Sequence, residues 1–284
     1  MRSLHLITIC AVAGIAFNGC QKDNTTNPTE ACQTLEVSSL ATHTIIEQTA
    51  TWCPACGAAK DDVAQATNLN QQVYHMAVHP YGTSDPIGNA RTEAFRNSVI
   101  KTGATPYIIG SINANYINQQ LQQPPSSQVA LSVQKNGSLL TVKAQVRLFE
   151  DFVGYQDNGC GVAGPNGNEQ YALETALYLG IFLIEDSIQE NQVNHGPYTH
   201  YNVMRDFLTD DAKGIELVGY GETVEAGRTF CHILNYDLDA NSYHTDWQNC
   251  QILAVLFEGN ICAATGDELF PFTKGSYLVD IGSL

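Results

Sequence analysis

The sequence predicts an α/β domain followed by an all-β antiparallel sandwich domain, because the periodicity of its apolar residues changes near the middle of the chain. Before residue 119, short segments rich in Ile, Val and Thr alternate with segments of helical spacing, which is typical of a sheet wrapped by helices. After residue 128 the apolar residues alternate with a period of two, as in antiparallel strands. The stretch between them, Gln119–Gln128, is polar and contains Pro-Pro and Ser-Ser, which indicates a linker.

The first domain is expected over residues 37–123, with a linker at 124–128. Strands are predicted over 42–49, 71–80 and 105–112, and helices over 53–69, 87–103 and 113–123. The first helix would have Cys53 at its N-cap and Pro54 at its first helical position, where the missing N–H of proline costs nothing.

The second domain is expected over residues 129–284, as a β-sandwich built from short strands. Asn136-Gly137 between two alternating segments is a strong signal for a two-residue hairpin. Further strands are predicted over 176–187, 228–238, 250–259 and 275–282, and the segment 200–208 is the candidate for a helix in this domain.

The first residues have the pattern of an export signal. Arg2 precedes an apolar run, Leu4–Phe17, that is shorter than the roughly 20 residues needed to span a bilayer, so residues 1–19 are read as a signal peptide. The segment Phe17–Cys20 resembles the bacterial lipobox, which implies lipid attachment at Cys20 and a polar tether over residues 20–36. The alternative is an ordinary secreted protein cleaved nearby.

Charge and cysteine content fit an exported protein that does not bind nucleic acid. The formal net charge is −16, and the 13 Lys and Arg residues form no cluster, whereas nucleic-acid binding depends on such residues. Exported proteins fold where disulfides persist. Of the nine cysteines, Cys10 would leave with the signal and Cys20 would carry lipid, so an odd number, seven, remains and at least one is unpaired within the chain.

The segment Trp52-Cys53-Pro54-Ala55-Cys56 raises three possibilities: a zinc half-site, a structural staple or a redox centre. Zinc needs further ligands, and there is no second C-x-x-C. His75 and His79 lie on a predicted strand, where a rise of roughly 3.3 Å per residue puts their Cα atoms about 13 Å apart. A staple across two residues closes so small a loop that it removes little entropy from the unfolded chain.

The redox interpretation explains the position of the pair at a strand-to-helix junction. Free N–H groups and the dipole at a helix N-terminus favour an anion, which lowers a thiol pKa and raises the fraction of the attacking thiolate. Cys53 is therefore expected to be the nucleophile, and Cys56, one turn later, the residue that resolves the mixed disulfide.

The segment around this pair resembles the active site of the thioredoxin superfamily, especially its exported, membrane-tethered thiol reductases with Trp-Cys-Pro-x-Cys. The resemblance implies that Glu47, six residues before Cys53, is a buried acid that takes the proton of Cys56; the alternative is a solvated strand residue. It also implies that Thr105-Pro106 is a cis bond whose backbone pairs with the substrate chain; the alternative is a trans proline opening an edge strand. Trp52 and Pro54 would belong to the same substrate-binding surface. One strand of the complete thioredoxin sheet is missing, since only Gly110–Asn113 precedes the last helix.

The whole-chain pattern resembles the Bacteroidota outer membrane lipoprotein family named for its twenty-eight-kilodalton member. The resemblance rests on the lipoprotein-like leader, the thioredoxin-like unit and a β-rich half containing Gly196–Asp206. It implies a lipid-anchored protein of the cell envelope, at the outer membrane, and implies architecture and location more than a reaction.

Several other residues have structural explanations that are simpler than functional ones. Structural disulfides are expected among Cys160, Cys231, Cys250 and Cys262, with Cys32 as the candidate for the odd thiol. Lys60–Asp62 is interpreted as a solvated helix face. The remaining cluster is a polar aromatic loop with His195, Tyr198, His200 and Tyr201. It is interpreted as a packed loop, and the alternative is that it contacts the first domain or a ligand.

Two functions are therefore expected from the sequence. The first is a cell-envelope thiol–disulfide oxidoreductase that exchanges disulfides with exported protein thiols and needs no metal or organic cofactor, because the cysteine pair stores the electrons. The alternative is a non-enzymatic surface binding or adhesion lipoprotein that uses the thioredoxin-like fold as a scaffold.

Overall fold

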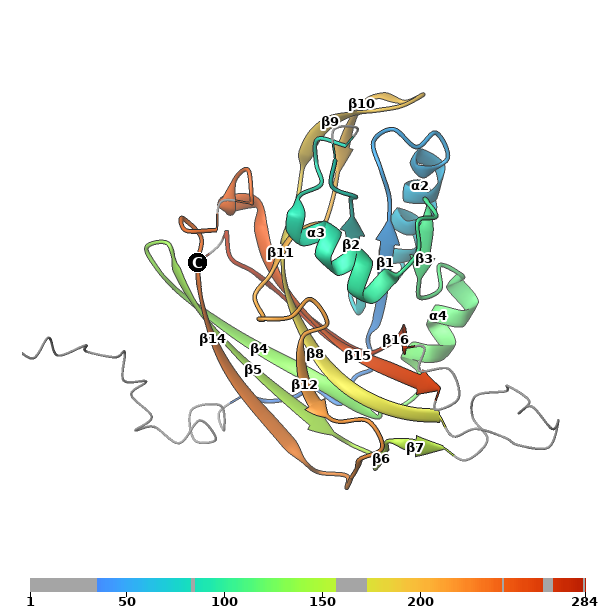
Figure 1. Ribbon diagram of the computed structural model, residues 1–284, viewed down its shortest axis with the longest axis vertical. Coiled ribbons are helices and arrows are strands. Elements are labelled where there is room, and N and C mark those ends of the chain that lie inside the picture. The colour runs from blue at the N-terminus through green and yellow to red at the C-terminus, as the bar shows by residue number, and fades with distance from the viewer. Residues whose placement is uncertain (1–34, 83–84, 157–172, 242, 263–267, 283) are drawn as a thin grey trace, which may run out of the picture.

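The fold is mostly β, with a mixed sheet and few helices (Figure 1). The structure is a computed structural model that describes residues 35–82, 85–156, 173–241, 243–262, 268–282 and 284. The predicted signal peptide, the lipid-attachment residue Cys20, most of the tether, and Cys32 and Cys160 lie outside the described residues.

The first part of the chain alternates strands and helices, as the sequence predicts. The order is β1 (His43–Gln48), α2 (Cys56–Thr67), β2 (Val73–Val78), α3 (Ala90–Phe95), β3 (Tyr107–Ile109) and α4 (Ala114–Leu121). β1 pairs in parallel with β2 and antiparallel with β3. α2 and α4 pack on one face of β1 and β2, whereas α3 packs on the other, so helices cover both faces.

Local chemistry sets the ends of these helices. Asn89 caps α3, with its side chain accepting from the amide of Thr92 while the Thr92 hydroxyl accepts from the Asn89 amide, which is a capping box. α3 continues into a π-helical turn, Arg96–Ile100, which ends at Lys101 in the left-handed conformation, two residues before the predicted end at Gly103. β3 is followed directly by α4, as the short connection Gly110–Asn113 predicts.

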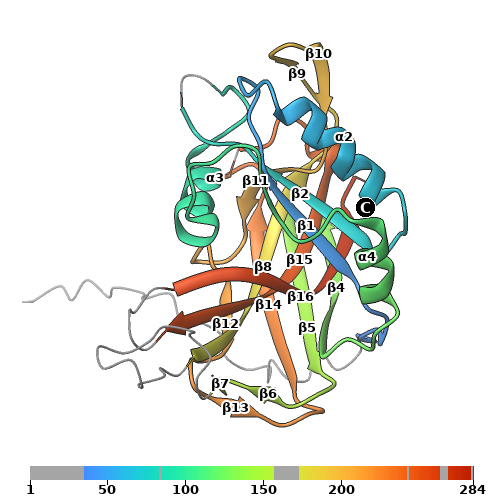
Figure 2. The ribbon, with the colours of Figure 1, turned by 90° about the vertical axis from the view of Figure 1, so that its right-hand side faces the viewer.

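A strand from the second half of the chain continues the sheet of the first half. β11 (Val203–Phe207) pairs in parallel with β2 and antiparallel with β8 (Leu173–Glu185). Within the described residues the sheet has nine strands, with the central order β16-β15-β8-β11-β2-β1-β3 (Figure 2). The helix considered for residues 200–208 is therefore wrong, because Val203–Phe207 is buried inside the sheet and its backbone bonds to strands on both sides.

The other strands of this sheet come from the C-terminal half. β15 (Cys250–Cys262) pairs with β8 and with β16 (Glu268–Asp280), and β7 (Tyr155–Gln156) and β12 (Ile215–Val218) pair with β8 along the edge opposite β15. β8 is apolar almost throughout because both of its faces are covered. Leu177, Leu179, Ile181 and Leu183 belong to one core and Tyr178, Phe182 and Ile184 to another.

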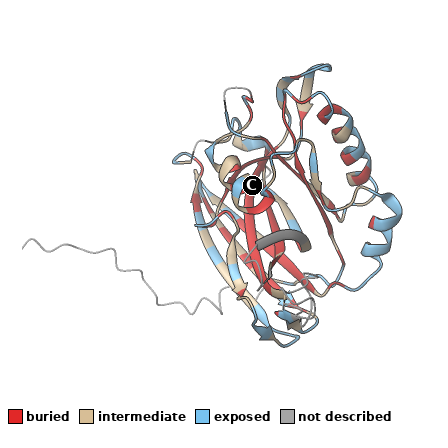
Figure 3. Ribbon diagram, turned by 45° about the vertical axis from the view of Figure 1, so that its right-hand side comes forward, coloured by how far each residue is buried: buried red, intermediate tan, exposed pale blue. Residues whose placement is uncertain are grey.

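A three-stranded antiparallel sheet packs against β8 and β15, which gives the sandwich that the sequence predicts. It has the order β14-β5-β4 and consists of β4 (Ser127–Asn136), β5 (Leu139–Leu148) and β14 (Thr229–Asp237). The predicted hairpin joins β4 to β5 through Gly137, whose φ is 62°. Figure 3 shows the buried strands of the two layers facing each other.

Two short pairs and one helical turn complete the described chain. β6 (Phe152–Val153) pairs with β13 (Thr223–Val224), and a 3₁₀ turn spans Trp247–Asn249. β9 (Ile188–Gln192) pairs with β10 (Gly196–His200) in a hairpin that lies near the start of α2 in both views (Figures 1 and 2). None of the helices in the described part of the chain has the length and apolar character needed to cross a bilayer.

Candidate functional site

Cys53 and Cys56 form a disulfide at the start of α2, with their Cα atoms 5.4 Å apart. Cys53 is 3% exposed and Cys56 is fully buried, so of the two only Cys53 reaches the surface. The helix begins at Cys56 with Ala55 as N-cap, two residues later than predicted. The reason is a pair of tight turns, in which Cys53 N donates to Ala50 O at 3.2 Å and Cys56 N to Cys53 O at 3.2 Å.

Glu47 is fully buried on β1, which confirms the predicted burial of this acid. It lies on the same face of the strand as Ile45, which packs against α2. The buried side of α2 begins with Cys56 and includes Lys60, so β1 places Glu47 under that side. His75 Nε2 lies 3.3 Å from Glu47 Oε2, within ion-pair distance but not aligned for a hydrogen bond, and no described group hydrogen bonds to either carboxylate oxygen.

The Thr105-Pro106 peptide bond is cis, as predicted, and it faces the cysteine pair. Cys53 Sγ lies 3.6 Å from Thr105 O. Gln48 fixes this segment, because its side-chain amide donates to Ala104 O at 2.5 Å and to Thr105 Oγ1 at 3.2 Å.

The surface beside this segment carries aromatic side chains. Trp52 is 43% exposed and Tyr107 is 40% exposed, and Pro54 is also exposed. The predicted substrate-binding positions Trp52 and Pro54 are thus accessible, while Thr105 and Pro106 are half-buried. Their role in binding a substrate stays a prediction.

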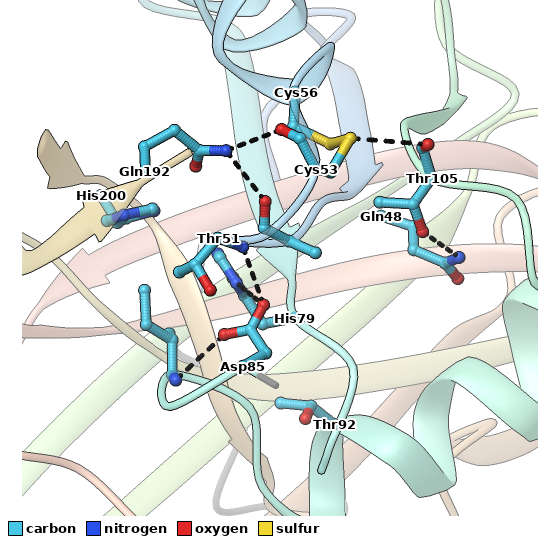
Figure 4. Close-up of polar contacts among 12 residues, drawn as sticks. Gln48, Thr51, Cys53, Cys56, His79, Asp85, Thr92, Thr105, Gln192 and His200 are labelled. Carbon is cyan, nitrogen blue, oxygen red and sulfur yellow. Dashed lines mark hydrogen bonds and ion pairs between the residues drawn. A yellow bond between two sulfur atoms is a disulfide. The ribbon is translucent and has the colours of Figure 1, made fainter. Parts of the chain in front are cut away.

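A second buried carboxylate, Asp85, holds the turn before Cys53 from below (Figure 4). Asp85 accepts hydrogen bonds from Thr51 N at 3.0 Å, from His79 Nδ1 at 3.0 Å and from Ile87 N at 3.1 Å. Burial alone would raise the pKa of Asp85, but the bonds from His79 and the two amides outweigh it and leave that pKa below its ordinary value. Burial lowers the pKa of His79 despite the contact with Asp85.

The β9–β10 hairpin brings further polar groups to the pair from the C-terminal half. Lys60 Nζ donates to His200 Nδ1 at 2.5 Å and to Gln192 Oε1 at 3.3 Å. Burial lowers the pKa of Lys60 to about 8, against the opposing effect of the Glu47 and Asp85 carboxylates. Burial, together with the charge of Lys60, lowers the pKa of His200 to about 3, so His200 is neutral at neutral pH.

A cavity of about 440 Å³ lies between α2, β2 and the hairpin. Lys60, His75, Tyr198 and His200 line it, which brings part of the predicted polar aromatic cluster to the back of the cysteine helix. A larger cleft of about 660 Å³ is lined instead by His43, Tyr116 and the Pro124-Pro125 segment. Among the described side chains no group of three or more His, Cys, Asp or Glu is placed to hold a metal ion.

Two interpretations of single residues are wrong. Lys60 is 8% exposed and bonded to the hairpin, so it does not belong to a solvated helix face, although Asp61 and Asp62 do. Cys250 is a buried free thiol, whereas Cys231 is in a disulfide. Cys231 on β14 and Cys250 on β15 do not lie on neighbouring strands, because β14 pairs with β5, whereas β15 pairs with β8 and β16. The side chain of Cys262 is outside the described set.

The residues that sequence reasoning missed are Gln192, Lys60, His79 and Asp85. Nothing in the loop His79–Asn89 singles out Asp85 as a buried group, and nothing in Gln189–Gln192 distinguishes one glutamine from another. The available signal was a weak one: Lys60 lies four residues after Cys56, on the same face of the predicted helix.

Comparisons with known proteins show a likeness of fold. No family model and no curated protein matches the chain. Among solved structures it is similar to HBP35 of Porphyromonas gingivalis, with a TM-score of 0.60 and 15% sequence identity, over 86% of this chain and 76% of that one. The E. coli curli protein CsgC gives a TM-score of 0.21 at 9% identity over 54% of this chain and 97% of that one, which is too low a score to carry an argument.

Proposed function

We propose that this protein is a thiol–disulfide oxidoreductase of the cell envelope, in which residues 37–123 form a thioredoxin-like unit. Exported proteins with disulfides or thiols are its substrates. The observation that carries the proposal is the setting of Cys53: its sulfur lies 3.6 Å from the carbonyl of the residue before a cis-proline, and Glu47 is buried under the same helix. A plain structural staple would need neither neighbour.

The residues divide the reaction into two exchanges. The Cys53 thiolate attacks one sulfur of a substrate disulfide, which forms a mixed disulfide and releases the other substrate sulfur as a thiolate. Cys56 gives its proton to Glu47 and attacks Cys53 Sγ, which forms the Cys53–Cys56 disulfide and releases the second thiolate. Two electrons pass from the protein to the substrate. Of the two released thiolates, one takes the Cys56 proton from Glu47 and the other takes a proton from solvent, equivalent to the one that Cys53 lost when it ionised. The reverse sequence oxidises a substrate dithiol.

Exposure supports this assignment of roles. Cys53 is the member of the pair that reaches solvent, as an attacking sulfur requires, and the fully buried Cys56 is suited to resolving a bond made by its neighbour. The exposed side chains of Trp52 and Tyr107 would contact the substrate chain, and the Thr105 backbone would pair with it.

We propose the same location that the sequence predicts. The protein would be anchored at the outer membrane through lipid on Cys20, as a relative of the Bacteroidota lipoprotein family. The likeness of its fold to HBP35 of Porphyromonas gingivalis supports that placement.

Trapping of the mixed disulfide tests the reaction. The reduced protein is mixed with an insulin-derived disulfide peptide, and covalent adducts are identified by mass spectrometry. Cys56→Ser should accumulate the adduct on Cys53, because the resolving thiol is gone, while Cys53→Ser should form none. Wild type should reduce the peptide, and both variants should fail to do so catalytically.

A control separates specific chemistry from thiol reactivity in general. Cys250→Ser removes a buried thiol far from the pair in sequence and should leave reduction of the peptide unchanged. If Cys53→Ser reduces the peptide as fast as wild type, the oxidoreductase proposal is wrong.

A second candidate is a non-enzymatic binding lipoprotein with the Cys53–Cys56 disulfide as a fixed brace. The low exposure of Cys53 and the dense contacts of the hairpin with the cysteine turn favour this alternative. It predicts that the disulfide resists dithiothreitol in the folded protein and that Cys53→Ser and wild type bind exported partners equally.

A further inference from the structure

The tip of the β9–β10 hairpin is seated on the turn that carries Cys53. Val193 N donates to Thr51 O at 2.8 Å. The ring of His195 lies against α2 at Gly57, where an added Cβ would collide with it. Because Gly57 is the residue after Cys56, the hairpin approaches the cysteine helix at its first turn.

Gln192, the last residue of β9, makes the closest connection between the hairpin and the pair (Figure 4). Its side chain is buried, and its Nε2 donates to Ala50 O at 3.0 Å and to Cys53 O at 2.9 Å. Its Oε1 accepts from Lys60 Nζ at 3.3 Å. A primary amide has two N–H donors and a carbonyl acceptor, so this position uses both donors and places a donor on the acceptor.

The two carbonyls that Gln192 binds are the ends of the turn before the helix. Ala50 O also accepts from Cys53 N, and Cys53 O also accepts from Cys56 N. One side chain thus ties together both ends of the turn, and with them the position of Cys53 Sγ relative to Thr105 O. In Figure 4, Gln192 lies on one side of the cysteine pair and Thr105 on the other, so the hairpin does not occupy the Thr105 side.

The Lys60 ammonium adds an electrostatic component. It bonds to the carbonyl end of the Gln192 amide, so the positive N–H end of the same amide points to the backbone carbonyls of Ala50 and Cys53. Hydrogen bonds in a chain polarise one another in a buried environment. A positive environment near Cys53 favours its thiolate.

We propose that Gln192 is a positioning residue of the Cys53–Cys56 centre, through which the C-terminal half holds the cysteine turn and raises the reactivity of Cys53. The inference rests on the proposed function, since it assigns Gln192 a part in the same site. It adds a requirement that a thioredoxin-like unit alone would not meet: the first half of the chain needs the hairpin of the second half for a reactive Cys53.

The groups that face Lys60 determine whether it keeps its charge. They come from β1, from the loop after β2 and from the hairpin. Besides Gln192 they are Glu47, His79, Asp85, Tyr198 and His200. The two carboxylates support the ammonium, while the two histidines are neutral, so Lys60 acts on Gln192 as a cation at neutral pH.

The test measures alkylation of Cys53 in the reduced full chain, which needs no substrate. Iodoacetamide labels Cys53 at a series of pH values, and the Cys53 peptide is quantified by mass spectrometry. Gln192→Leu should raise the Cys53 pKa by about one unit and slow labelling about tenfold at pH 6, where labelling follows the thiolate fraction. Gln192→Asn keeps the amide but is too short to reach all partners, and it should be slowed about threefold.

Gln189→Leu is the matched control, because Gln189 lies on the same strand but is exposed and bonds to Thr199 of β10 and to Ser187, which immediately precedes β9. It should label like wild type. The inference is overturned if Gln192→Leu, folded by circular dichroism, has the Cys53 pKa and labelling rate of wild type. If Gln192→Leu does not fold, Gln192→Asn decides by the same comparison.

The outcome is separable from that of the proposed function. A wild type that labels rapidly at Cys53 but exchanges no disulfide with the peptide would contradict the oxidoreductase and leave the role of Gln192 standing. If wild type reduces the peptide and Gln192→Leu has the same Cys53 pKa as wild type, the oxidoreductase proposal stands and the role of Gln192 is contradicted.

Discussion

The two sides of Cys53 differ in how they are built. The closed side is buried and held by hydrogen bonds between segments from both halves of the chain. It consists of Thr51, Lys60, His79, Asp85, Gln192 and His200. The open side, formed by Trp52, Thr105, Pro106 and Tyr107, has exposed aromatic side chains and a contact of 3.6 Å between Cys53 Sγ and Thr105 O.

The difference separates support from reaction. Buried polar groups that are hydrogen-bonded to one another make a rigid frame, and removing one partner leaves the others unpaired at considerable cost. Exposed aromatic side chains contribute little to stability and much to contact with another chain. We therefore expect substitutions on the closed side to change stability and, at Gln192, also the reactivity of Cys53, whereas substitutions on the open side should change contact with the substrate.

Removal of Asp85 should give the largest loss of stability. Asp85→Ala leaves the amides of Thr51 and Ile87 and the ring of His79 without an acceptor in a buried site. We expect the free energy of unfolding to fall by about 4 kcal/mol, measured by urea denaturation of the oxidised protein. Asp62→Ala, on the exposed face of α2, should change it by less than about 0.5 kcal/mol. Equal losses in the two variants would mean that the closed side is not a frame.

Lys60 should make stability depend on pH in the alkaline range. Its pKa is about 8 in the folded protein against an ordinary value of 10.5, so between these values the unfolded chain holds a proton that the folded chain lacks. The folded state is therefore most stable, as far as Lys60 is concerned, above pH 10.5, and it loses this stability as the pH falls from 10.5 through 8. The difference between the ordinary Lys60 pKa of 10.5 and the folded value of about 8 corresponds to a change of about 3 kcal/mol in the free energy of unfolding.

The measurement is the unfolding free energy of wild type minus that of Lys60→Met between pH 7.5 and 10.5. We expect this difference to increase with pH in favour of wild type. A difference that stays constant across the window would show that Lys60 is not buried against the hairpin.

Substitution of Gly57, which His195 contacts, should change the free energy of unfolding by a smaller amount. Whether the change stabilises or destabilises should depend on the presence of the His195 ring. Gly57→Ala gains helix propensity but collides with the imidazole, so we expect a net loss of about 1 kcal/mol in thermal or urea unfolding. In a His195→Ala background the same change should become stabilising, by about 0.5 kcal/mol. A loss that is equal in both backgrounds would place the hairpin away from the helix.

Tyr107→Ala on the open side should have the smallest effect on stability. Because Tyr107 is 40% exposed, we expect a change below about 0.5 kcal/mol. The second-order rate constant for reduction of a disulfide peptide should nevertheless fall roughly fivefold, the loss of about 1 kcal/mol of contact with the substrate. Tyr81→Ala, on an aromatic residue that is more exposed, should leave both quantities unchanged. An unchanged rate constant in Tyr107→Ala would remove Tyr107 from the substrate surface.

The open side could be predicted from the sequence and the closed side could not. The order of strands and helices follows from local patterns, and the cis Thr105-Pro106 bond and the burial of Glu47 follow from the resemblance of the Cys53 segment to the thioredoxin superfamily. Gln192 lies 139 residues from Cys53 and reaches it through a hairpin whose polar sequence has no apolar period to reveal it. Lys60 was misjudged for the same reason, because its partners are on that hairpin. Whether a long polar side chain is solvated or buried depends on which distant segment covers it.

The most direct test of the central claim is hydrogen exchange in the trapped complex. Cys56→Ser is joined through Cys53 to a disulfide peptide, and its amide exchange is compared with that of the unmodified variant. If substrate enters from the open side, protection should increase in peptides that contain Thr105–Tyr107 and stay unchanged in those that contain Val193–Gly196. Protection of the hairpin instead, or no adduct on Cys53, would contradict the account.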